Sequence, residues 1–461
     1  MVHILICLLL QAFYVSISGG QGNLRDVRLK EKKETTESHI FMESIPHLDL
    51  RNDLSKKHRM DSDYMHTVVF VTTQNNSEEL LRILQDVSDP ASVNYGQHLS
   101  REDVTKMTVN TEAFDSVVKF VNSRGASVAS KTLNGEYITC DAPLSVWEGM
   151  FNCEFFMFHQ SDTDDAITQI VRAESYFIPR DLEPHVKSVF NTVQMPYRPS
   201  NHRVANLQDS SPYVTIDTLT SAYNLGTSTG STSSTQGIYA TIDQNFSPND
   251  LSAFQLYYNL AVQAVSTSIG GHVSSQLCVT NPTSCVEANL DVQYIMATST
   301  VSPTTFWYTD FSSFSSWLVE VADVINPPLV LSISYGMEEQ YVTSAEFHAF
   351  NVQAVKLGAM GITIVVASGD SGAVSRFYDV ETCVYAPSFP ASSPYVTSVG
   401  ATMVQIYATV INCTSLKFYE EQNRSQIPFI SLIKYFISLF LHIRVLNPAK
   451  LRSLVSQIKV D

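Results

Sequence analysis

The stretch that most constrains the fold is Gly361 to Gly372, which reads GITIVVASGDSG. Its apolar, β-branched run from Ile362 to Ala367 predicts a buried strand of a parallel sheet. Ligand sites of open α/β sheets lie just beyond the carboxyl ends of such strands. Asp370 follows this strand directly, so we expect it at a functional edge unless it only caps a turn, as Asp often does.

The same turn permits another interpretation. The string Gly-Asp-Ser-Gly also resembles the residues around the nucleophilic serine of trypsin-like proteases. By that resemblance, Ser371 would be the nucleophile. Trypsin-like proteases are double β-barrels. The alternation of strands and helices in this chain disfavours that fold.

Residues 213–403 alternate between short apolar runs and segments with helical spacing. Such alternation predicts parallel strands joined by crossover helices, and therefore an α/β domain. Strands are expected at 238–242, 304–308, 329–335, 362–367 and 394–399, and helices at 218–223, 247–258, 286–298, 311–324 and 343–357.

The preceding part of the chain has a different texture. Residues 63–195 mix strand and helix patterns within one domain length, which predicts a compact α+β domain. Residues 21–62 are charged and irregular, and we expect a flexible lead-in there. Residues 196–212 are polar and contain Pro and Ser, which predicts an exposed linker open to proteolysis.

The net charge and the N-terminal residues indicate which partners and which cellular compartment to expect for this protein. The 461 residues carry a formal net charge of −16, which argues against nucleic acid as a partner. Residues 1–20 have an apolar run that ends in small residues, as a secretory signal peptide does. The run is shorter than the roughly 20 apolar residues of a membrane span. We therefore expect a protein of the secretory pathway, lysosomal or extracellular, with no membrane span.

Cysteines and glycosylation sequons agree with that route. Of seven Cys, Cys7 would leave with the signal, and an even number remains for disulfides. Cys278 and Cys285 are close enough in sequence to pair locally, and Cys140 and Cys153 stand at the ends of neighbouring elements. Sequons begin at Asn75, Asn245, Asn412 and Asn423.

An acidic pair stands on the expected helix at 286–298. Glu287 and Asp291 are four residues apart and so share a helix face, where two like charges are mildly destabilising. Neighbouring carboxylates share a proton, and one pKa rises. Such a pair can supply a general base in acid. The alternative is a solvated acidic face with no chemical role.

Several separated motifs, in this order, resemble one family. SDPASVNYGQHLS at 88–100, EANLD at 287–291, SGDSG at 368–372 and FPASSPYVTSVGAT at 389–402 resemble the sedolisin serine-carboxyl peptidases, and within them the lysosomal tripeptidyl-peptidase branch. The resemblance covers residues 65–403. It implies a subtilisin-like parallel-sheet catalytic domain, here incomplete, preceded by an activation propeptide at 63–195.

The resemblance also implies roles. Glu287 would be the general base, Asp291 its partner, and Asp370 the residue of the oxyanion hole. The substrate would be a peptide or protein, cleaved in acid, and the propeptide would be an intramolecular inhibitor. Complete members of the family bind Ca²⁺, but this chain contains no matching ligand loop and no metal site is expected.

The resemblance ends near residue 403. The family nucleophile lies in a Gly-Thr-Ser motif well after SGDSG, and no such motif follows Gly372 here. Residues 404–461 form a divergent tail, which we interpret as the mark of a truncated or alternatively spliced chain or of a mistaken gene model.

Two further hypotheses stay open. A subtilisin-type triad would use Asp243, His272 and Thr402, with Thr in place of Ser. Alternatively, a chain without a nucleophile would be a catalytically inactive homologue that acts as a binding or inhibitory protein.

Overall fold

The computed structural model describes residues 38–46, 48, 54–161, 167–196, 214–226, 229–309, 313–370 and 385–400. The chain divides into two units, Met1–Glu37 and Ser38–Asp461, and every described residue belongs to the second unit.

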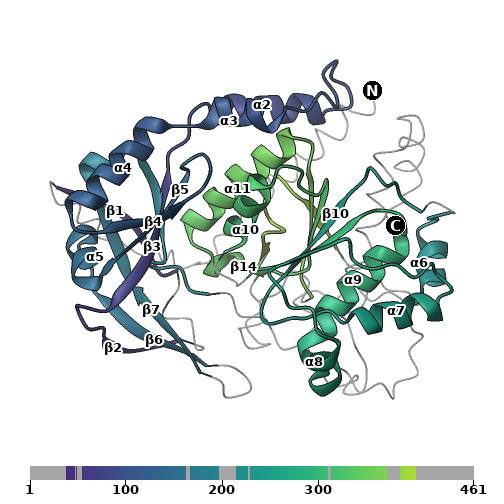
Figure 1. Cartoon of the computed structure of the whole chain (residues 1–461). Helices are drawn as coiled ribbons and strands as arrows, with labels where there is room; N and C mark the ends of the chain where they lie inside the picture. Colours follow the sequence, from purple (N-terminus) through teal and green to yellow (C-terminus); the bar gives the residue numbers. More distant parts are fainter. Residues whose placement is uncertain are drawn as a thin grey trace, which may run out of the picture. The chain divides into compact units, whose positions relative to one another are not determined.

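A six-stranded sheet forms the centre of the second half (Figure 1). Its strand order is β11-β12-β10-β13-β15-β17, and all neighbouring strands are parallel. The strands are β10 (Gln236–Ala240), β11 (Thr267–Ile269), β12 (Thr304–Tyr308), β13 (Val330–Ile333), β15 (Thr363–Ala367) and β17 (Thr397–Val399). Strands buried on both faces need continuous apolar runs, which explains the composition of these segments.

Helices cover both faces of this sheet (Figure 1). Tyr239 and Ile364 pack with α10 (Phe314–Asp323) and α11 (Ser344–Ala359) on one face. Their sequence neighbours Ile238 and Val365 pack with α7 and α9 on the other. The period of two in a strand produces this division. The remaining helices are α6 (Ile216–Ala222), α7 (Pro248–Tyr257), α8 (Ser275–Thr280), η3 (Pro282–Cys285), α9 (Val286–Thr298) and η4 (Glu339–Tyr341).

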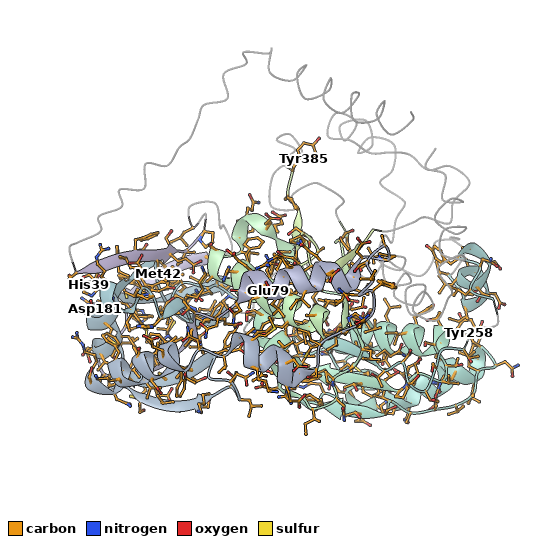
Figure 2. The ribbon with its side chains drawn as sticks, turned by 90° about the horizontal axis from the view of Figure 1, so that it is seen from above. His39, Met42, Glu79, Asp181, Tyr258 and Tyr385 are labelled. Carbon is orange, nitrogen blue, oxygen red and sulfur yellow. A yellow bond between two sulfur atoms is a disulfide. The ribbon has the colours of Figure 1, made fainter. Side chains whose placement is uncertain are left out.

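A small antiparallel pair joins β14 (Met337–Glu338) to β16 (Ser388–Phe389). Just before β16, the side chain of Tyr385 projects away from the ribbon, with 74% of its surface exposed (Figure 2).

The first half contains two larger antiparallel sheets and a strand pair. One sheet has the order β4-β5-β3-β9, another β2-β6-β7, and β1 pairs with β8. The strands are β1 (His39–Ser44), β2 (Leu54–Arg59), β3 (Met65–Thr72), β4 (Ser127–Lys131), β5 (Tyr137–Pro143), β6 (Phe155–Ser161), β7 (Ile167–Ala173), β8 (Ser175–Pro179) and β9 (Val186–Phe190). The helices are α2 (Ser77–Ser88), α3 (Arg101–Thr108), α4 (Thr111–Ser123), α5 (Leu144–Phe151) and η2 (Arg180–Leu182).

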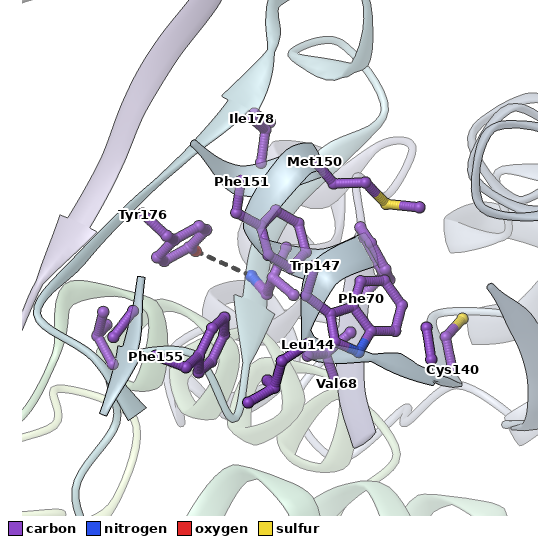
Figure 3. Packing of buried hydrophobic residues seen from close by; sticks show 14 of the residues in the cluster. Val68, Phe70, Cys140, Leu144, Trp147, Met150, Phe151, Phe155, Tyr176 and Ile178 are labelled. Atoms are coloured by element: carbon purple, nitrogen blue, oxygen red, sulfur yellow. Dashed lines mark hydrogen bonds between the residues drawn. The ribbon is translucent and has the colours of Figure 1, made fainter. Parts of the chain in front are cut away.

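The core of this half is aromatic (Figure 3). Trp147 stacks on Phe151, with ring centroids 5.6 Å apart, and Phe151 meets Tyr176 edge to face. The buried hydroxyl of Tyr176 accepts the backbone N–H of Val189 at 3.0 Å. A buried Tyr needs such a partner, so this contact ties β8 to β9 inside the core.

The predicted classes are confirmed: an α+β part precedes a parallel α/β part. The prediction that residues 21–62 are irregular is wrong, because strands β1 and β2 both lie within that range. Those strands pair with β8 and β6, more than a hundred residues later, and local composition does not reveal such long-range pairing. The expected signal, and almost all of the linker and the tail, lie outside the described residues.

The cysteine predictions divide. Cys278 and Cys285 form a disulfide that joins α8 to η3. The suggested pairing of Cys140 with Cys153 is wrong here, because both are free thiols. Cys140 points into the aromatic core and Cys153 packs against it (Figure 3 draws Cys140). Burial raises the pKa of each thiol to about 12, which makes both unreactive.

Candidate active site

Helix α9 carries the acidic pair. Glu287 and Asp291 are only 5% and 6% exposed, so the alternative of a solvated acidic face is wrong. Apolar neighbours on the same helix, such as Val292 and Ile295, fix it against the sheet. Burying two carboxylates is costly unless they gain hydrogen bonds, and the carboxylate of Asp291 gains one from Ser334.

Asp291 contacts the sheet through Ser334, the first residue after β13. The Ser334 hydroxyl donates to Oδ1 of Asp291 at 2.9 Å. Burial raises the pKa of Asp291 well above its usual range, and the Ser334 bond opposes part of that rise. Asp291 therefore keeps a proton over a pH range in which an exposed Asp would be charged.

Glu287 is fixed through the start of its helix. The N-terminus of α9 has no side-chain cap from Cys285, the residue before it. Instead, Oε1 of Gln244 accepts the backbone N–H of Glu287 at 3.1 Å, and Nε2 of Gln244 donates to the backbone oxygen of Thr283 at 3.1 Å. Gln244 follows β10, so this contact places the start of α9 beside the end of that strand.

Asp370 lies three residues beyond β15 and is half-buried. Strands β10, β13 and β15 are parallel neighbours, so their carboxyl ends share one edge of the sheet. Gln244 and Ser334 bring the acidic pair to that edge, where Asp370 also stands. The roles assigned to the three acids remain predictions.

Sequence reasoning missed Gln244 and Ser334. Both are polar residues just after a buried strand, which is the signal that singled out Asp370. Neither belongs to a motif, so nothing in the sequence set them apart from other polar residues of loops.

The alternative triad is partly assembled. Nε2 of His272 lies 3.6 Å from Oδ1 of Asp243, and the imidazole stacks on Tyr308 with centroids 3.3 Å apart. Asp243 and His272 both have left-handed backbones, with φ of 54° and 56°. The third member, Thr402, lies outside the described residues, as does Ser371.

The structure qualifies the glycosylation prediction. Asn245 is 7% exposed and its amide donates to the backbone oxygen of Asp243, so its sequon is inaccessible in this fold. Asn75 is exposed. Asn412 and Asn423 lie outside the described residues.

The described residues contain neither a cluster of metal ligands nor a helix that could span a membrane. No three His, Cys, Asp or Glu side chains there gather as metal ligands. No helix in that part of the chain is both long and apolar enough to cross a bilayer.

The first half binds the second through α11. Lys356 of α11 forms a buried ion pair with Glu136, which lies just before β5. Gln353, one turn earlier, donates to Oε2 of the same carboxylate at 3.0 Å. Leu99 donates its backbone N–H to Ala359 at the end of the helix. The two halves therefore share charged, polar and backbone contacts along one helix.

A second contact reaches the start of α11. Oε1 of Glu43, on β1, accepts the backbone N–H of Ala345 in the first turn at 2.5 Å. Oε2 of the same residue accepts from Gln194 at 3.2 Å. Because α11 follows β13, its N-terminus lies toward the carboxyl edge of the sheet, where the acidic pair stands. The first half thus contacts the end of α11 that lies toward this edge.

Comparisons with known proteins agree with the division of the chain into two halves. Residues 52–195 match the family described as "Pro-kumamolisin, activation domain". Tripeptidyl-peptidase 1 of Canis lupus familiaris is 30% identical over 368 residues, which is 75% of this chain and 63% of that protein. The human protein of the same name is 29% identical over 373 residues, again 75% and 63%.

A solved structure of a Pseudomonas sedolisin, a serine-carboxyl proteinase complexed with two molecules of pseudo-iodotyrostatin, is 23% identical with a TM-score of 0.31, covering 41% of this chain and 52% of that one. The chain spans about 63% of the length of the curated relatives it matches. Over 75% of its length the chain is therefore similar to tripeptidyl-peptidase 1, and its residues 52–195 match an activation domain of the pro-kumamolisin type.

Proposed function

We propose that the chain encodes an acid-acting serine-carboxyl peptidase made as a zymogen. The observation that carries this proposal is the buried pair of Glu287 and Asp291 at the carboxyl edge of the sheet. A protein gains no stability from two buried acids on one helix face, so a chemical role is the better explanation.

In this mechanism Glu287 is the general base. A serine hydroxyl attacks the peptide carbonyl, its proton passes to the Glu287 carboxylate, and the same proton later passes to the leaving amine. Asp291, protonated because burial raises its pKa, donates a hydrogen bond to Glu287 and holds it in place. No residue of this chain is assigned as the serine, because no Gly-Thr-Ser motif follows Gly372.

Asp370 would serve the oxyanion. A protonated carboxyl at the end of β15 can donate to the negative oxygen of the tetrahedral intermediate. Removing such a donor typically costs about 2.7–4 kcal/mol of transition-state stabilisation. Asn keeps a donor at this position, so Asp370→Asn should retain more activity than Asp370→Ala.

The activation domain would keep the zymogen latent. Its contacts with Ala345 and Lys356 hold it on the helix that begins beside the candidate site. The disulfide between Cys278 and Cys285 favours an oxidising compartment. Together with the signal-like N-terminus, it supports the secretory route, lysosomal or extracellular. We assign no Ca²⁺ ligands to this chain.

The test is an activity assay of the full chain after acidification to about pH 4. One peptide substrate has a free N-terminus and a second is blocked. Glu287→Gln should abolish cleavage, whereas a change of Glu320, an exposed acid on α10, to Gln should not. Cleavage of the free peptide alone would add tripeptidyl-peptidase specificity, and cleavage of both would indicate an endopeptidase.

A second candidate follows from one observation. No Gly-Thr-Ser motif follows Gly372 in this sequence. A folded, acid-treated chain that cleaves neither peptide would overturn the first proposal. The chain would then be an inactive homologue whose activation domain acts as a binding or inhibitory protein. Binding of the folded chain to an active relative would test that function directly.

A further inference from the structure

A cavity of about 160 Å³ lies where the activation domain meets α11. One wall comes from β3, from β9 and from Ser77, the first residue of α2, and the other from α11. By the same measure a single water needs only about 10–15 Å³. The cavity therefore has room for a polyatomic ligand.

The charge around the cavity is one-sided. Lys187 from β9 and His348 from α11 both line it, and no Asp or Glu does. Among the described residues, neither side chain forms an ion pair or a hydrogen bond. Burial lowers the pKa of His348, and the positive charge of Lys187 lowers it further. The lining of the cavity thus holds two basic side chains and no acidic one.

One polar atom of the lining also lacks a hydrogen-bond partner among the described residues. Oε1 of Gln74 is buried and has no hydrogen-bond partner among the described residues, although its Nε2 donates to Glu136 at 2.9 Å. The hydroxyl of Ser77 is exposed beside it. A buried acceptor without a donor costs about 1–3 kcal/mol, so a ligand that supplies an O–H group would be favoured here.

A second cavity at this interface shows the contrast. It measures only about 20 Å³, and its lining pairs Lys356 with Glu136 and Arg101 with Asp323. Its charges are balanced by the protein itself. The larger cavity has positive charge, space and a buried acceptor, and its described lining contains no acidic side chain to balance that charge.

We propose that this cavity is a binding site for a small protonated oxyanion, of which dihydrogen phosphate is the simplest, held by Lys187 and His348 between the activation domain and α11. The anion oxygens accept from the two basic side chains and from Ser77. The O–H of the anion donates to Oε1 of Gln74. Phosphate suits this site better than sulfate, which has no O–H at moderately acid pH.

Because its walls come from both halves, the bound anion would strengthen their association. The ligand would stabilise the assembled chain by binding the folded form and not the unfolded one. This inference does not depend on peptidase activity, since its measurement is binding. Failure of the proposed function would leave it intact, and the reverse also holds.

The experiment is thermal unfolding of the full chain near pH 5 with increasing inorganic phosphate, at constant ionic strength set by chloride. Saturating phosphate should raise the unfolding midpoint by about 2–4 °C. Titration calorimetry of the unmodified protein should give one phosphate per chain. Lys187→Met should weaken the affinity about ten- to a hundredfold, because a charge-assisted bond is lost.

The matched control is Lys119→Met, which removes an exposed lysine of α4 and should respond to phosphate as the natural chain does. His348→Gln provides a second variant if Lys187→Met does not fold. The proposal is overturned if phosphate gives no shift, if chloride or sulfate gives the same shift, or if Lys187→Met responds like Lys119→Met.

Discussion

Lys356 and Glu136 form an ion pair in which only 4% and 8% of the two side chains are exposed. The carboxylate is further satisfied by Gln74 and Gln353, which both donate to Oε2. Burial lowers the pKa of Lys356, and Glu136 opposes that effect. A charge buried this deeply is tolerated only while its partner is present, so the two halves of the chain depend on each other here.

Lys356→Met should therefore destabilise the folded chain by about 3–5 kcal/mol, because it leaves the Glu136 charge buried and unpaired. Chemical denaturation at pH 7 measures this as a lower midpoint. The double variant with Glu136→Gln should be less destabilised than the sum of the two single variants, since neither charge then remains. Additive effects would show that the ion pair does not couple the halves.

Two glycines in helices provide a second prediction. A Cβ at Gly358 of α11 would lie 2.8 Å from Cδ1 of Leu84 on α2, whereas a Cβ at Gly149 of α5 would meet nothing within 4 Å. Gly149→Ala should raise stability by about 0.5–1 kcal/mol through helix propensity alone. Gly358→Ala should gain less or lose stability, because Leu84 must move. Equal gains in denaturation midpoint would contradict close packing of α2 on α11.

Much of the fold could be predicted from local patterns. Helix α9 and strand β12 begin and end at the predicted residues, since their apolar spacing is strong. Strands β1 and β2 were missed because their partners are remote in sequence. The pairing of Cys140 with Cys153 failed because sequence position does not show which way a thiol points.

The candidate site was predictable in its acids and not in their support. Glu287 and Asp291 were found because two like charges on one helix face need a reason. Gln244 and Ser334 act only through tertiary contacts, from the ends of β10 and β13. Such contacts depend on strand order, and one sequence does not specify that order.

Glu346 gives a prediction on pH. It accepts both the N–H and the hydroxyl of Ser315, and burial raises its pKa from 4.5 to about 7. A carboxyl with a raised pKa stabilises the fold fully below pH 4.5, and this contribution, up to about 3 kcal/mol, is lost as pH rises through 7. Glu346→Gln should therefore flatten the fall in unfolding midpoint between pH 4.5 and 8. Glu112→Gln, at an exposed site on α4, should leave the slope unchanged.

The disulfide between Cys278 and Cys285 should contribute measurably to stability. It closes a short loop over a sequence separation of 7, for which restriction of the unfolded chain predicts about 2–3 kcal/mol. Replacing both residues by Ser should lower the unfolding midpoint, and reducing agent should lower that of the natural chain to a similar value. Cys140 is a free thiol, so replacing it by Ala should leave the response to reducing agent intact. A chain insensitive to reductant would contradict the bond.

Ser334→Ala tests whether the sheet edge tunes the acidic pair. The hydroxyl stabilises the charged form of Asp291, so its loss should raise the pKa of that carboxyl further. A bond to a charged acceptor contributes about 1.5–3 kcal/mol, and one to a neutral acceptor about 0.5–1.5 kcal/mol. At pH 5 the carboxyl of Asp291 is protonated, and at pH 9 it is more often charged, so the bond from Ser334 contributes more to folding stability at pH 9. The variant should therefore differ from the natural chain more at pH 9 than at pH 5. Unfolding midpoints at the two pH values measure the difference.

The control is Ser252→Ala, which removes a hydroxyl that donates to the backbone oxygen of Pro248. Its effect on the unfolding midpoint should be the same at both pH values. The contact does not tune Asp291 if Ser334→Ala lowers the unfolding midpoint by the same amount at both pH values. It also does not tune Asp291 if the effect of Ser334→Ala stays pH-dependent in a chain that carries Asp291→Asn.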